Sequence, residues 1–244
     1  MKCIHIDARD LPDAWFQSVY SCLDHGTKHV IDSGSFAGQQ RLEIDYITIN
    51  IKQPGFPYDR LSNDDLTPKL PAHYNVPNPV TEGYIDEYLH YLMSGDIKPG
   101  EQYTYGQRLW AAVRGLPNYS LDKNREVLNQ VARVIWVYKN RGHRNNQMVL
   151  QVAQPFDLLL SDPPCLRQID TRIQDNKLHF FIYFRSWDLW NGMPSNLPVI
   201  QILKEYMAQE IGVEDGEIIA ASKGLHLYDY AWDIAKRLKG DLSY

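Results

Sequence analysis

One cysteine of this sequence stands in a setting that favours nucleophilic chemistry. Cys165 follows Pro163 and Pro164, and each proline ring fixes its own φ, so the chain enters the cysteine along a restricted path. The thiolate is the nucleophilic form of cysteine, and nearby positive charge lowers the thiol pKa. Arg185 ends the second arm of a predicted hairpin, from which its side chain can reach the region of Cys165. The alternative is an inert cysteine, since unpaired cysteines are often small core residues.

The residues after this hairpin are of types that bind a phosphorylated ligand. Arg185 and Ser186 are adjacent, and a planar guanidinium fork beside a hydroxyl suits a phosphate. Asn196 stands where a helix is predicted to begin. It can cap that helix, or its amide can read the edge of a base, because an amide both donates and accepts hydrogen bonds.

Three motifs in consistent order resemble the thymidylate synthase family. They are Pro163-Pro164-Cys165, the pattern Arg-Ser-x-Asp-x-x-x-Gly-x-Pro-x-Asn over residues 185–196, and His-x-Tyr at residues 226–228. The resemblance implies that Cys165 adds to carbon 6 of a pyrimidine nucleotide and turns carbon 5 into a nucleophile toward a one-carbon unit. It also implies that Asp188 lies on the pterin-facing side of the site.

The same resemblance implies a set of nucleotide contacts. Arg185 would bind the phosphate and help lower the thiol pKa, and Ser186 would also contact the phosphate. Asn196 would hydrogen-bond the uracil edge, and His226 and Tyr228 would hold a sugar hydroxyl.

Upstream, two further residues match the family's pattern less closely. A helix ending in Gly95-Asp96 resembles the helix that carries the family's catalytic glutamate, with one extra residue before Gly-Asp. This favours Glu87 as the proton-transfer residue, with Glu82 as second choice and a solvated helix charge as the alternative. Tyr105-Gly106 resembles the family's Tyr-Gly pair and makes Tyr105 a candidate for the later elimination step.

Basic residues complete the expected phosphate site. The loop 33–35 lies where the family places an N-terminal phosphate-binding loop, with Arg41 or Lys28 as the basic residue. Arg144, with Arg141, lies where the family's dimer donates arginines to the partner's phosphate, although a solvated basic turn is the plainer interpretation. A homodimer is therefore expected.

Several departures from the family pattern touch the pterin side. Leu166 follows the nucleophile in place of histidine, Phe184 precedes Arg185 in place of glutamine, and Lys223-Gly224 replaces Gly-Asp. These changes resemble the compact archaeal members, so the expected co-substrate is methylene-tetrahydrofolate or methylene-tetrahydromethanopterin. The expected reaction is reductive methylation of dUMP to dTMP. The alternatives are hydroxymethylation of a pyrimidine nucleotide, in which water replaces the hydride, and nucleotide binding without turnover.

The hydropathy pattern predicts the elements that must position these residues. Strands and helices mix without strict βαβ alternation, which favours an α+β class with a mixed or antiparallel sheet packed with helices, as one catalytic domain over residues 1–244. The predicted helices cover 12–25, about 81–95, a segment capped by Asp122, 196–211 and a short C-terminal stretch; the predicted strands cover 3–6, 42–51, 148–152, 168–174, 177–185 and 217–221.

Composition excludes several classes of protein. The 244 residues hold 25 Lys and Arg against 30 Asp and Glu, a net charge of −5, with 44% hydrophobic residues. Those values are typical of a globular protein and argue against disorder or a nucleic-acid partner. Three cysteines without a CxxC pair predict neither a disulfide framework nor a metal site. The sequence shows no signal peptide or membrane-spanning run, so a cytoplasmic location is expected.

Overall fold

The larger sheet forms from strands whose residues alternate between buried and exposed positions. In the computed structural model, which describes residues 1–32, 37–113 and 127–240, six strands pair in the order β1-β4-β11-β9-β8-β7. Their bounds are β1 Cys3–Ala8, β4 Tyr46–Ile51, β7 Val149–Gln151, β8 Leu166–Gln174, β9 Lys177–Phe184 and β11 Glu214–Ser222. The strands β1 and β4 are parallel and β8 and β9 antiparallel. The predicted α+β class with a mixed sheet is confirmed.

A smaller sheet stands beside the larger one and corrects one prediction. In the part of the chain that the structure describes, its order is β10-β12-β3-β2, with β2 Thr27–Val30, β3 Gln40–Ile44, β10 Trp187–Asp188 and β12 Leu225–Tyr228. The predicted strand 42–51 is wrong as one strand, because it divides at Asp45 between β3 of the smaller sheet and β4 of the larger. The Asp45 carboxylate accepts the Lys2 backbone N–H at 2.7 Å, which holds the break. A short ladder joins β5 Ala112–Val113 to β6 Val127–Leu128.

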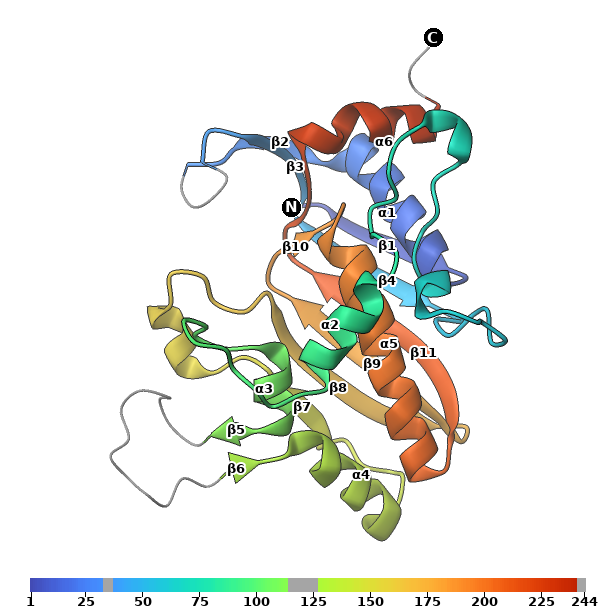
Figure 1. Cartoon of the computed structure of the whole chain (residues 1–244), viewed down its shortest axis with the longest axis vertical. Coiled ribbons are helices and arrows are strands. Elements are labelled where there is room, and N and C mark those ends of the chain that lie inside the picture. The colour runs from blue at the N-terminus through green and yellow to red at the C-terminus, as the bar shows by residue number, and fades with distance from the viewer. Residues whose placement is uncertain (33–36, 114–126, 241–244) are drawn as a thin grey trace.

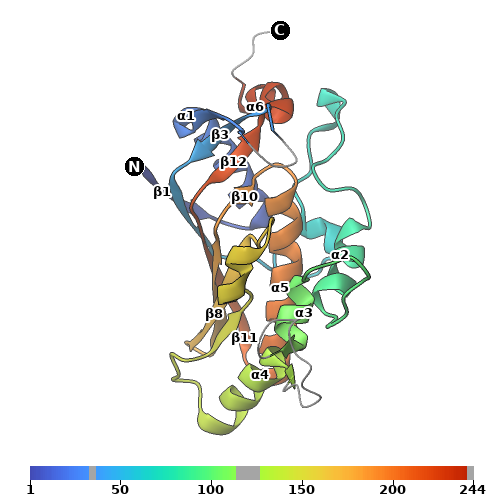
Figure 2. The same cartoon turned by 90° about the vertical axis from the view of Figure 1, so that its left-hand side faces the viewer.

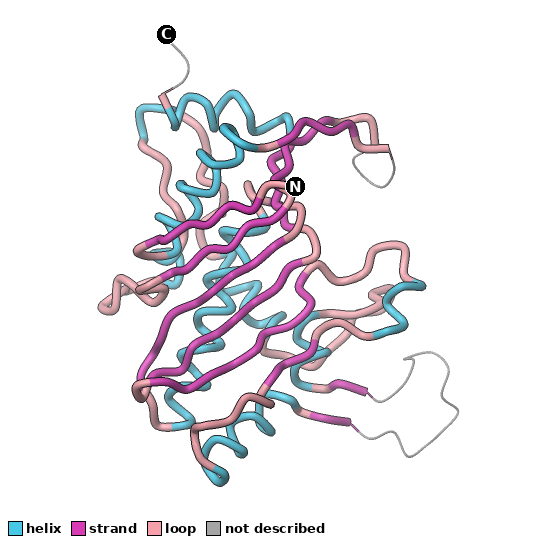
Figure 3. The backbone as a smooth tube through the Cα atoms, turned by 180° about the vertical axis from the view of Figure 1, so that it is seen from behind, coloured by secondary structure: helices cyan, strands magenta, loops and turns pink. Residues whose placement is uncertain are grey.

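Helices gather on one side of the larger sheet. Their bounds are α1 Leu11–His25, α2 Tyr84–Leu92, α3 Tyr105–Trp110, α4 Gln130–Arg141, α5 Gly192–Ile211 and α6 Trp232–Lys239. The long helix α5 crosses the front of the sheet, with α2 and α3 beside it (Figures 1 and 2). From behind, no described helix crosses in front of the strands of the larger sheet, so this face of the sheet is open (Figure 3). None of the described helices has the length and apolar character that crossing a membrane requires.

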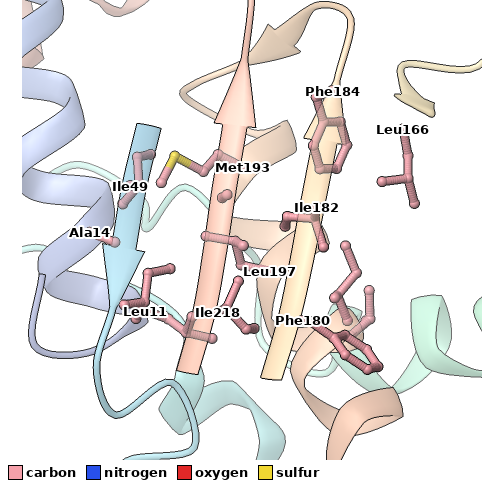
Figure 4. Close-up of a cluster of buried hydrophobic side chains, with 14 of the residues drawn as sticks. Leu11, Ala14, Ile49, Leu166, Phe180, Ile182, Phe184, Met193, Leu197 and Ile218 are labelled. Carbon is pink, nitrogen blue, oxygen red and sulfur yellow. The ribbon is translucent and has the colours of Figure 1, made fainter. Parts of the chain in front are cut away.

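The core fixes α5 against the sheet. Phe180, Ile182 and Phe184 share one face of β9 and are at most 2% exposed. They gather with Met193 and Leu197 of α5 (Figure 4). Burying one such side chain contributes on the order of 1.5–3 kcal/mol. The beginning of α5 is therefore held in place relative to the ends of β8 and β9.

Two predicted helix starts are wrong, and local hydrogen bonds explain one of them. Helix α5 begins at Gly192 rather than Asn196, because the Asp188 carboxylate accepts the Trp190 N–H at 2.9 Å and organises the preceding turn. The predicted cap Asp122 lies outside the described residues, and the helix after it begins at Gln130. Val127, which follows the predicted cap, is in β6 and is 61% exposed.

Candidate active site

Cys165 lies where the hairpin of β8 and β9 meets the diproline segment. Its carbonyl accepts the Arg185 backbone N–H at 2.8 Å, which holds the two residues opposite each other. The register of the strands shifts between Leu166 and Gln168, and an irregularity of this kind redirects side chains at a strand end. The turn of the hairpin uses Asp175 and Asn176 at φ 52° and 58°, the positive values that a tight right-twisted hairpin requires.

The Arg185 guanidinium folds over the diproline segment. Its Nε donates to the carbonyls of Pro163 and Pro164, each at 3.2 Å, and a terminal nitrogen lies 3.2 Å from the Asp162 carboxylate. The Asp162 side chain is 89% exposed, so this ion pair is weak. A phosphate can therefore take the place of Asp162 without a large loss of free energy.

Burial governs the charge of the Cys165 thiol. The sulfur lies in a half-buried residue, and burial raises its pKa above the ordinary value. Arg185 and Arg167 act in the opposite direction, while Asp162 and Asp188 raise the pKa further. Arg185 thus contributes in the expected direction, but desolvation outweighs it, and the thiol form is favoured.

Tyr105 approaches Cys165 from the start of α3. Its hydroxyl accepts the Leu166 backbone N–H at 3.2 Å, and burial raises its pKa to about 12, so the phenol stays protonated. The close approach of α3 to α2 depends on Gly106. A Cβ there would lie 2.2 Å from the Ser94 carbonyl and 2.3 Å from that of Tyr91, which no other residue can tolerate.

Asn196 faces the site from the second turn of α5 and does not cap the helix. The Trp187 indole N–H donates to its Oδ1 at 3.0 Å, and its Nδ2 donates to the Tyr88 hydroxyl at 3.0 Å. The two bonds hold the amide on both sides. Asp188, just before α5, is largely desolvated, and burial raises its pKa although backbone N–H groups lower it.

A second group of polar residues lies on β12 and β3. His226 donates from Nδ1 to the Gly224 carbonyl at 2.9 Å, and Ser186 Oγ lies 3.5 Å from the same nitrogen. Burial lowers the pKa of His226 to about 4. The ring is therefore neutral near pH 7, and its buried Nε2 has no hydrogen-bond partner among the described residues. This nitrogen is an acceptor that a ligand hydroxyl can satisfy.

Arg41 joins this group through its strand pairing. It lies opposite Tyr228 in the antiparallel pairing of β3 and β12, hydrogen-bonds the Tyr228 side chain and pairs with Glu43 at 2.6 Å. The rings of Tyr228 and His226 meet edge to face at 4.9 Å. The structure therefore brings Arg41, Tyr228 and His226 together, while the loop residues 33–35 lie outside the described residues.

Two pockets meet at Tyr88. One of about 350 Å³ is lined by Pro79, Val80, Thr81, Tyr84, Tyr88, Asp188, Asn191, Gly192, Ser195 and Asn196. The other, of about 230 Å³, is lined by Tyr88, Tyr91, Leu92, Tyr103, Thr104, Tyr105 and Gly106. Cys165 lies near residues that line these pockets, because its ionised form would raise the pKa of Tyr88 and Tyr105 and the Asp188 charge raises the pKa of Cys165. A nucleophile, hydrogen-bond donors and flat aromatic walls thus share one region.

Comparison with known proteins agrees with this geometry. The sequence model of the family described as thymidylate synthase matches residues 83–239. The chain belongs to the thymidylate synthase family. A protein named "Putative thymidylate synthase" from Methanosarcina mazei is 28% identical over 237 residues, covering 96% of this chain and 93% of that protein.

More distant relatives carry similar names. One named "Putative thymidylate synthase" from Methanothermobacter thermautotrophicus is 25% identical over 92% of this chain and 93% of its own length. The "Thymidylate synthase" of Listeria monocytogenes is 30% identical, over 43% of this chain and 33% of its own length. Thymidylate synthase family members are enzymes that bind a nucleotide and a methylene-pterin co-substrate.

Two residues expected in a thymidylate synthase-like site lie apart from this region. Glu87 is exposed on α2, whereas the neighbouring Tyr88 lines both pockets. Arg144 is exposed and lines a separate pocket of about 400 Å³ with Arg172 and Asn176, at the turn end of the hairpin. Cys165 stands at the opposite end of that hairpin.

Tyr88 and Trp187 are site residues that sequence reasoning missed. The sequence did carry a signal for Tyr88. Glu87 fits the family's helix only with one extra residue before Gly95-Asp96, and counting back at the family's own spacing reaches Tyr88 instead. The expectation of a catalytic carboxylate pointed to Glu87 and not to this phenol. Trp187 occupies the variable position of the Arg-Ser-x-Asp pattern, and its bond to Asn196 depends on a side-chain orientation that no spacing rule predicts.

Proposed function

We propose that this chain methylates dUMP to dTMP, with a methylene-tetrahydropterin as the source of the carbon and the hydride. The observation that supports this best is the Cys165 sulfur, held opposite Arg185 and within electrostatic reach of Tyr88 and Tyr105. A nucleophile flanked by a phosphate-binding cation and by protonated phenols is the set of groups that covalent addition to a nucleotide base requires.

The nucleotide spans the two groups of polar residues. Its phosphate replaces Asp162 on the Arg185 guanidinium, with Ser186 and Arg41 as further donors. A sugar hydroxyl donates to His226 Nε2, the buried acceptor described above, and Tyr228 lies against the same ring. A neutral imidazole is required for this contact, because a protonated ring has no lone pair to offer.

The covalent step begins when the Cys165 thiol gives its proton to water and Sγ bonds to carbon 6 of the pyrimidine. The electron pair of the carbon 5–carbon 6 double bond moves toward the carbonyl at carbon 4, whose oxygen gains negative charge. Asn196 and Tyr88 stabilise that oxygen by donating hydrogen bonds. Tyr88 thereby takes the proton-transfer role expected of Glu87, and Tyr105 relays the proton that carbon 5 later loses.

The pterin is a co-substrate, and the tyrosine-lined pocket fits its flat ring. Tyr88, Tyr91, Tyr103 and Tyr105 line a hollow beside the diproline segment, to which Tyr103 is tied by a 3.2 Å hydrogen bond to the Asp162 carbonyl. Aromatic faces stack on a planar heterocycle and exclude water. When bound, the pterin supplies the one-carbon unit and then a hydride, while Asp188 faces the adjoining pocket.

A second copy of the chain completes the site. The open face of the larger sheet carries Phe181, which is 38% exposed, beside Ile219 on the adjacent strand. Arg144 cannot serve Cys165 of its own chain from the far end of the hairpin, so it is proposed to contact the phosphate held by the partner. A dimer with twofold symmetry covers both open faces at once.

Trapping with 5-fluoro-dUMP tests the proposal. Fluorine at carbon 5 blocks the loss of the proton, so a ternary adduct accumulates on Cys165 and is weighed by intact-protein mass spectrometry. The test is run with methylene-tetrahydrofolate and with methylene-tetrahydromethanopterin. An adduct with neither pterin would refute catalysis and favour a nucleotide-binding protein. With dUMP itself, a product one oxygen atom heavier than dTMP would identify a hydroxymethylase.

A further inference from the structure

The Asn196 amide is held in one orientation by a neighbour that can only donate. The Trp187 indole N–H points at the amide from 3.0 Å, and an indole has no acceptor to offer. The amide oxygen must therefore face the indole, and the amide nitrogen faces the Tyr88 hydroxyl at 3.0 Å. This assignment follows from the hydrogen-bonding capacity of the indole.

Trp187 itself has little freedom to move. It is 1% exposed, and its ring stacks on Phe184 with centroids 4.1 Å apart and planes 4° apart. Its backbone N–H also donates to the Gly224 carbonyl at 3.2 Å. If the amide turned over, two donors would face each other in a buried position, and a buried donor without a partner is costly. The Tyr88 hydroxyl can donate or accept, so it opposes neither orientation.

We infer that Trp187 is a positioning residue that sets the base specificity of the site through Asn196. In the held orientation, the amide keeps one N–H and one oxygen lone pair for a ligand in the pocket that Asn196 lines. These match the carbonyl at carbon 4 and the adjacent N–H of uracil. Cytosine presents the reverse pattern, an amino donor beside a ring-nitrogen acceptor. The inference rests on the proposed function, since it requires a pyrimidine nucleotide in this pocket.

The direct test is Trp187→Phe, which keeps a ring against Phe184 and removes the N–H. The dissociation constants of dUMP and dCMP are measured by calorimetry, and kcat/KM for each is measured where turnover occurs. The wild type is expected to prefer dUMP. In the variant the preference is expected to fall about tenfold or more, because the amide can then turn over to meet cytosine.

Two further variants separate this role from general support of the fold. Trp15→Phe is the matched control, because Trp15 is also fully buried and its indole donates at 2.8 Å to the Leu189 backbone carbonyl. It loses the same kind of bond without freeing an amide, so the dUMP preference stays. Tyr88→Phe is expected to lower kcat while keeping the ratio of the two dissociation constants within about threefold, since Trp187 still blocks the turned amide.

The outcomes distinguish the inference from the proposed function. A wild type that binds neither nucleotide overturns both. If the wild type prefers dUMP and the Trp187→Phe protein keeps the full preference, the inference is overturned and the proposed function stays intact. A wild type that prefers dCMP also overturns the inference. If Trp187→Phe does not fold, Trp187→His takes its place, because an imidazole can donate or accept and must relax the preference in the same way.

Discussion

His226 gives the sharpest link between the structure and a solution measurement. The side chain is buried, its Nδ1–H is bonded to the Gly224 carbonyl, and burial lowers its pKa to about 4. In the unfolded chain its pKa is near 6.5. Because the folded value is the lower one, the unfolded chain binds the proton first as the pH falls. His226 therefore stabilises the fold above pH 6.5, and that contribution is lost as the pH falls toward 4.

The size of the loss follows from the two pKa values. Between pH 7 and pH 5, the unfolded state gains a proton at this position and the folded state gains almost none, which lowers the free energy of unfolding by about 2 kcal/mol. His226→Asn removes the titration while its amide nitrogen can still donate to Gly224. The variant is expected to be less stable at pH 7, because the ring is lost, but its free energy of unfolding should fall about 2 kcal/mol less over this pH range.

Urea unfolding at pH 7 and pH 5, followed by tryptophan fluorescence, measures both proteins. His90→Asn serves as the control, because His90 also bonds a backbone carbonyl through Nδ1, at 2.7 Å, but is exposed on α2. Its pH response should match that of the wild type. An identical pH response in His226→Asn and the wild type would show that the buried ring is not held neutral, and the assignment of Nε2 as the acceptor for a sugar hydroxyl would be abandoned.

Three other predictions address the reaction. Cys165→Ser should lower turnover by at least about a thousandfold, because a hydroxyl is a far weaker nucleophile, while dUMP binding measured by calorimetry stays within about threefold. The control Cys3→Ser changes an exposed thiol and should keep full activity. Near-normal rates in Cys165→Ser would disprove the assignment of the nucleophile. Arg185→Gln should raise the pKa of the Cys165 thiol further and slow its alkylation by iodoacetamide at pH 8, because the guanidinium lowers that pKa; an unchanged rate would contradict this. Mixing inactive Cys165→Ser with inactive Arg144→Ala should restore up to about a quarter of the wild-type activity through mixed dimers; no recovery after subunit exchange would count against a shared phosphate site.

Motifs close in the sequence were predicted more reliably than contacts between distant segments. Cys165 and Arg185 meet because one hairpin joins them, and its turn is encoded by Asp175-Asn176. Alternation along residues 42–51 identified extended structure but not the change of sheet at Asp45. That change depends on pairing with β12, about 180 residues later in the chain, and local periodicity carries no information about it.

The helix predictions failed where a side chain outside the helix determines its start. Residues after Asn196 carry the apolar pattern, so the start was placed there, but Asp188 accepts backbone N–H groups and moves it to Gly192. The consequence is chemical, because Asn196 then faces the pocket instead of capping the helix. The position of Tyr88 on α2 was missed for a similar reason. Its role depends on contact with Asn196, about a hundred residues away.

One helix connects the stability of the core to the chemistry of the site. Met193 and Leu197 are four residues apart on the side of α5 that packs into the core, and both are at most 1% exposed. Asn196, between them in sequence, lines the pocket. Because the helix is rigid over these two turns, the packing that holds Leu197 also fixes the position of the Asn196 backbone. Trp187 then has only the orientation of the amide left to determine, which a single donor can do.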